Sequence, residues 1–86
     1  MTLQVERVPG FRIVVASDPL FEKLIAEVYF NDEIVAIVSE ERGEAVFDLE
    51  IWPKKDGSIW TFELVAFQEA VTRAESRLRR LDDTSK

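Results

Sequence analysis

The sequence predicts an α+β domain in which an antiparallel sheet of four to five strands, a β-hairpin meander, is covered on one face by a single C-terminal helix. Short β-branched and aromatic segments alternate with turn residues over the first 62 positions, which is typical of hairpins. From Leu64 the apolar spacing changes to that of a helix. A length of 86 residues allows one hydrophobic core, so we expect a single domain over residues 1–86.

Four segments have the composition of strands, and turn residues bound each of them. Asn31 and Asp32, which both tolerate positive φ, form a two-residue turn between the second and third segments. Gly43 marks the next turn, and Pro53 ends the fourth segment. The predicted strands cover residues 11–16, 23–30, 33–40 and 45–52, with 59–62 as a candidate short strand and Leu3 to Val8 as a strand or a lead-in.

Six apolar residues near the end of the chain follow one another at intervals of three or four positions, which places them on one face of a helix. We therefore predict a helix over residues 64–81 that packs on the sheet, and a polar tail over residues 82–86 that frays. The six residues are Leu64, Phe67, Val71, Ala74, Leu78 and Leu81.

Two-residue turns would also fix which side chains share a sheet face, because cross-strand partners lie on the same side. The face expected to meet the helix collects Ile25, Tyr29, Ile34, Ala36, Val38, Phe47, Leu49 and Ile51. The second face collects Ala26, Val28, Phe30, Val35, Ile37, Val46 and Trp52, with Asp48 and Glu50 among them. Because this second face is too apolar for water, the segment Leu3 to Val8, a second copy or another protein should cover it, and we expect the second copy.

The side chains that are missing exclude most catalytic mechanisms. The chain has no histidine and no cysteine, which removes Ser-His-Asp and Cys-His catalysis, thiolate redox chemistry and the usual zinc sites. The three glycines form no phosphate-binding loop. We therefore expect no cofactor, no bound metal and no enzymatic activity.

The first alternative is a carboxylate-dependent or metal-dependent hydrolase. Asp48 and Glu50, two positions apart on one strand, point to the same side and could act as general acid and base or bind magnesium or calcium. Acidic residues on a strand more often keep its surface hydrated, so the hydrolase ranks below a non-catalytic binding role.

The second alternative is a nucleic-acid contact through Arg73, Arg77, Arg79 and Arg80 of the helix. Cations near a helix C-terminus also offset its dipole and pair with acidic residues. The net charge of −6 opposes a general affinity for nucleic acid, so this alternative ranks third.

The function that we expect is a small acidic protein-binding or regulatory module, of the inhibitor or immunity type with a basic target, or a homodimer with Val35, Ile37 and Trp52 near its centre. No apolar run is long enough for a membrane span and no secretory signal precedes the first segment, so a cytoplasmic location without membrane contact is expected. The candidate interface consists of Val28, Val35, Ile37, Asp48, Glu50, Trp52 and Trp60.

Overall fold

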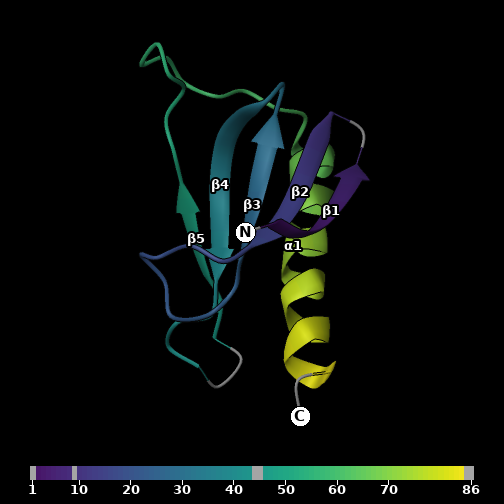
Figure 1. Cartoon of the computed structure of the whole chain (residues 1–86). Helices are drawn as coiled ribbons and strands as arrows, with labels where there is room; N and C mark the ends of the chain where they lie inside the picture. Colours follow the sequence, from purple (N-terminus) through teal and green to yellow (C-terminus); the bar gives the residue numbers. More distant parts are fainter. Residues whose placement is uncertain (1, 9, 44–45, 85–86) are drawn as a thin grey trace.

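The fold is the predicted α+β class, a five-stranded antiparallel sheet with one C-terminal helix packed against it (Figure 1). A computed structural model describes residues 2–8, 10–43 and 46–84, and side chains within these ranges except those of residues 2–4, 6 and 81–84. The strands lie in sequence order, so each pairs with its neighbour in the chain. The elements are β1 (Thr2–Val8), β2 (Phe11–Ala16), β3 (Ile25–Phe30), β4 (Glu33–Ser39), β5 (Asp48–Ile51) and α1 (Leu64–Thr84).

β2 has the predicted bounds, β3 begins two residues later and β4 ends one residue earlier than predicted, and the larger differences lie near β5. Asn31 and Asp32 have φ angles of 51° and 62°, as the predicted turn requires. The segment Leu3 to Val8 belongs to β1, at one edge of the sheet. The predicted strand over residues 45–52 shortens to β5, and residues 44–45 lie outside the described part of the chain. Residues 59–62 form no strand, because the whole connection from β5 to α1 is irregular.

A β-bulge at Val35 decides which side chains of the sheet face the helix. Beyond the turn, Val28 pairs with Ala36 rather than with Val35, so Val35 is an extra residue on β4. The Val35 carbonyl accepts a hydrogen bond from the backbone N–H of Trp52 at 2.8 Å. The extra residue shifts the register by one position, and such a shift exchanges the two faces of a strand. Val28 therefore lies on the helix side of β3, whereas the prediction placed Ile25 on that side. The predicted assignment of β3 to the two faces is therefore wrong.

Helix α1 packs mainly against β2 and β3. Ala70 and Ala74 are fully buried and Leu78 is nearly so, and the small alanines let the helix approach the sheet closely. Leu64 was predicted to be buried on the apolar face of the helix, but its side chain is 67% exposed. The side chain of Leu81 lies outside the described part of the structure. The helix also continues past residue 81. No helix among the described residues combines the length and the apolar character that a membrane span requires.

An aromatic cluster closes the core at the start of α1, with Phe62 at its centre. The ring centroids of Phe11 and Phe30 lie 5.0 Å from that of Phe62, and those of Trp60 and Phe67 lie at 5.2 and 5.6 Å. Aromatic pairs at these separations attract one another beyond the effect of burial. The irregular segment before α1 is therefore held to β2 and β3 by its rings.

The sheet face away from α1 is partly covered by the connection between β2 and β3. In Figure 1, residues 17–24 cross in front of β4, on the side opposite to the helix. The Glu41 carboxylate accepts hydrogen bonds from two backbone N–H groups of this connection at 2.7 and 2.9 Å. On this face Ile25 and Ile37 are buried within a single chain.

Candidate functional site

The structure separates the seven residues of the predicted interface. Val28 and Val35 are 0% and 1% exposed and belong to the core beneath α1. Ile37 is buried on the other side of the sheet. These three side chains offer no contact surface in a single chain. The other four residues lie on β5 and on the segment that follows it, and they are Asp48, Glu50, Trp52 and Trp60.

The two acidic residues of β5 point away from the helix and have partners of their own. Asp48 accepts hydrogen bonds from the Nε and Nη2 atoms of Arg42, and this interaction raises the pKa of Arg42 above its ordinary value. Glu50 accepts a hydrogen bond from the Trp52 indole N–H at 3.1 Å. Within the described ranges, no three acidic residues come together in a group that could hold a metal ion. We find no observation that favours the hydrolase alternative.

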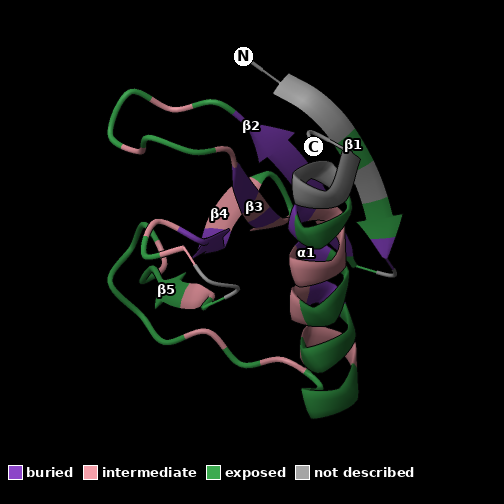
Figure 2. Cartoon of the chain, turned by 90° about the horizontal axis from the view of Figure 1, so that it is seen from below, coloured by how far each residue is buried: buried purple, intermediate pink, exposed green. Residues whose placement is uncertain are grey.

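An apolar groove opens between β5 and the first turns of α1. Its volume is about 260 Å³, and it is the feature of this region most suited to binding. Among the described residues no Cα atom of α1 lies within 8 Å of a Cα atom of β5, so the helix backbone does not cover this strand. Figure 2 shows exposed residues on β5 and at the start of α1, with the segment 52–63 running between the two elements. The groove is lined by Val35, Ile51, Trp60, Phe62, Leu64 and Phe67.

Large apolar side chains on both walls of this groove are exposed. Ile51 is 61% exposed on the β5 side, and Leu64 is 67% exposed on the helix side. Leu49, on the same face of β5 as Ile51, is 44% exposed. All three residues were predicted to lie in the core, because their periodicity shows the face on which they lie but not where the helix stops covering that face.

Trp60 lines the groove, and its position is fixed by contacts with the segment that follows β5. The Trp60 indole N–H donates a hydrogen bond to the backbone carbonyl of Trp52 at 2.9 Å. The Nζ atom of Lys54 lies 5.3 Å from the centroid of the Trp60 ring, in cation–π geometry. Trp60 is half-buried in the groove, whereas Trp52 is 43% exposed at its outer rim.

β5 is also an edge strand of the sheet. It pairs with β4 on one side and is the last strand in the order, so its other edge presents backbone N–H and C=O groups outward. Its side chains alternate in character. Asp48 and Glu50 lie on the face away from α1, and Leu49 and Ile51 lie on the face that borders the groove.

The arginines of α1 are engaged with side chains of their own domain. Arg79 donates hydrogen bonds to Glu75 at 2.9 and 2.6 Å and lies over the Phe47 ring, 4.6 Å from its centroid. Arg73 lies 4.0 Å from Glu69. These contacts agree with a structural role for the arginines, and the nucleic-acid alternative gains no support from them.

Comparison of the chain with protein-family models, with curated proteins and with solved structures gave no match.

Proposed function

We propose that this protein is a non-catalytic binding module whose β5 edge and adjoining groove receive an extended segment of a partner protein. The observation that carries the proposal is the uncovered groove, where Ile51 and Leu64 are exposed on facing walls. An added strand would pair with the free edge of β5 and place alternate side chains in the groove. Burial of those side chains would supply most of the affinity.

The alternation of β5 defines the chemistry of the partner segment. Side chains opposite Leu49 and Ile51 should be apolar, and side chains opposite Asp48 and Glu50 should be basic, because opposite charges stabilise directly paired positions. The net charge of −6 favours encounter with a basic partner. An inhibitor or immunity protein with a basic target would fit this pattern, as the sequence analysis expected.

A second copy of the chain suits the β5 edge less well. Antiparallel pairing about a twofold axis would place the acidic residues of one β5 opposite those of the other, and like charges in such positions destabilise. The homodimer was predicted because Val35 and Ile37 were expected to need a cover, but both side chains are buried within one chain. The homodimer and the cytoplasmic location stay predictions.

A pair of short peptides tests the proposal. One alternates lysine and isoleucine, and the other has the same composition arranged in two blocks. We expect the alternating peptide to shift the NMR signals of the Trp60 indole and of the Leu49 and Ile51 amides in a saturable way. The block peptide should bind more weakly, because it cannot place its charges and its apolar groups on opposite sides of the added strand.

Matched substitutions distinguish the groove from general charge attraction. Ile51→Lys should weaken binding of the alternating peptide at least about tenfold, or about 1.4 kcal/mol. Ile59→Lys introduces the same charge at a site that is 86% exposed and does not line the groove, and it should leave binding close to that of the parent protein. Equal binding of the two peptides would refute the strand proposal. A dimer in sedimentation equilibrium that Ile51→Lys dissociates would identify a second copy as the occupant and also overturn it.

A further inference from the structure

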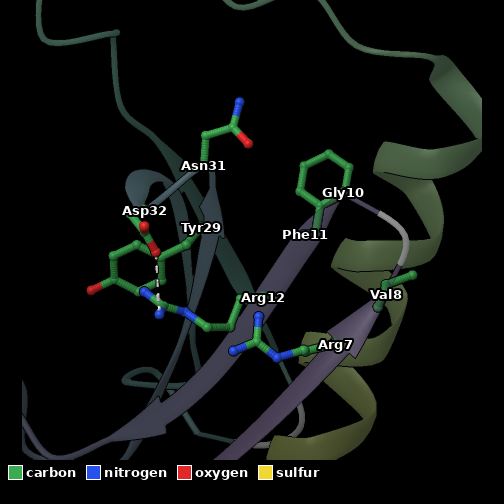
Figure 3. A pocket seen from close by; sticks show the side chains of 8 residues that line it. All are labelled: Arg7, Val8, Gly10, Phe11, Arg12, Tyr29, Asn31 and Asp32. Atoms are coloured by element: carbon green, nitrogen blue, oxygen red, sulfur yellow. Dashed lines mark ion pairs between the residues drawn. The ribbon is translucent and has the colours of Figure 1, made fainter.

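A second pocket, separate from the groove, lies where the β1–β2 and β3–β4 turns approach each other. Its volume is about 360 Å³, and two arginine side chains from neighbouring strands extend to the same side of it (Figure 3). It is lined by Arg7, Val8, Gly10, Phe11, Arg12, Tyr29, Asn31 and Asp32. Two guanidinium groups in one pocket are unexpected in a chain whose net charge is −6.

The two arginines form a directly opposed pair of like charges. Arg7 on β1 is the register partner of Arg12 on β2, and like charges in this position destabilise a sheet. Arg7 is exposed, and no ion pair of its guanidinium occurs with any side chain that the structure describes. A bound anion would relieve the repulsion between the two side chains.

Arg12 is already oriented for an anion. Its guanidinium carbon lies 4.7 Å from the centroid of the Tyr29 ring, and its Nη1 atom lies 3.4 Å from an Asp32 carboxylate oxygen. Its Nε atom is buried and has no hydrogen-bond partner in the described structure. The Asp32 side chain is 88% exposed, so this ion pair is weak and can be exchanged at low cost.

We propose that this pocket binds an oxyanion, and specifically a phosphate group that bridges the guanidinium groups of Arg7 and Arg12 and displaces the Asp32 carboxylate. Guanidinium groups match phosphate through paired, charge-assisted hydrogen bonds. A phosphate group has enough oxygens to pair with both arginines, whereas a carboxylate offers only two. The Asp32 carboxylate occupies part of this site and shows that the Arg12 guanidinium pairs with an anionic oxygen there. This inference is independent of the groove and of its proposed partner.

Titration with inorganic phosphate tests the site, followed by NMR of backbone amides and arginine side chains at constant ionic strength. We expect saturable shifts at Arg7, Arg12 and the neighbouring turns, with a dissociation constant of about 1 mM or lower. Acetate in a parallel titration should bind several-fold more weakly. Arg7→Gln and Arg12→Lys should each weaken phosphate binding, the second because lysine keeps the charge but loses the paired donors.

Asp32→Asn provides a test in the opposite direction. It removes the competing carboxylate and retains a residue that tolerates positive φ, so phosphate should bind more tightly. Asp56→Asn makes the same change in net charge at a turn that does not line the pocket and should have little effect. No saturation below about 20 mM phosphate would overturn the site. Equal tightening by Asp56→Asn would also overturn it, because net charge alone would then explain the effect. Acetate binding as tight as phosphate binding would overturn the preference for phosphate.

Discussion

The Phe62→Ala substitution should remove the ring that joins the irregular segment before α1 to the core. Phe62 has four aromatic neighbours with centroids 5.0 to 5.6 Å away, and its own side chain is half-buried. Truncating a buried phenylalanine to alanine costs about 3 to 5 kcal/mol, and partial exposure places this site near 3 kcal/mol. A chain of 86 residues has a stability of about 9 kcal/mol at a typical 0.1 kcal/mol per residue, so the variant should still fold.

Urea unfolding followed by circular dichroism measures this loss. With an m-value of about 1.5 kcal/mol/M, the midpoint should fall by about 2 M at an unchanged slope. Ile59→Ala is the control, because this side chain lies in the same segment, is 86% exposed, and should change stability by less than about 0.5 kcal/mol. A loss below about 1 kcal/mol for Phe62→Ala would refute the role of the aromatic cluster in stability.

Three further predictions follow from individual side chains and turns. The pKa of Tyr29, the sole tyrosine, is raised above its ordinary 10.0 by burial and by Glu27, so tyrosinate absorbance should titrate above that value and Glu27→Gln should lower the midpoint. The folded state keeps the phenol proton of Tyr29 to a higher pH than the unfolded chain does. The contribution of Tyr29 to the free energy of unfolding is therefore fully present below pH 10 and should be lost as the pH rises above it. A Tyr29→Phe variant should not show this loss. Gly10→Ala should cost about 2 kcal/mol by thermal unfolding, because φ is +84° and the added Cβ would lie 3.1 Å from the Phe30 ring. Gly57→Ala, with φ +83° but open space around it, should cost only about 1 kcal/mol.

Much of the fold could be predicted from local sequence signals. The change in apolar period at Leu64 located the start of the helix, and Asn31 with Asp32 located a turn in which both residues have positive φ. The bulge at Val35 had no local signal, because four of the seven residues of that strand are β-branched and each register would bury some of them. The Val35 carbonyl accepts a hydrogen bond from the backbone N–H of Trp52, a tertiary contact that the residues of the strand do not reveal.

The candidate site was predictable only in part. Trp52 and Trp60 belonged to the predicted interface, and Trp60 does line the groove. The exposure of Ile51 and Leu64 could not be inferred, because it depends on where α1 lies across the sheet rather than on the residues themselves. Missing the bulge also placed Val28 on the wrong face of its strand.

The order of the strands has a consequence for how the chain folds. Because every strand pairs with its chain neighbour, sheet formation closes only short loops and has a low contact order. Docking of α1 on β2 and β3 is different, since it joins segments separated by β4, β5 and the irregular connection. We therefore expect the hairpins to form before the transition state and the helix to dock after it, so that substitutions at Ala70 and Ala74 slow refolding less than they speed unfolding.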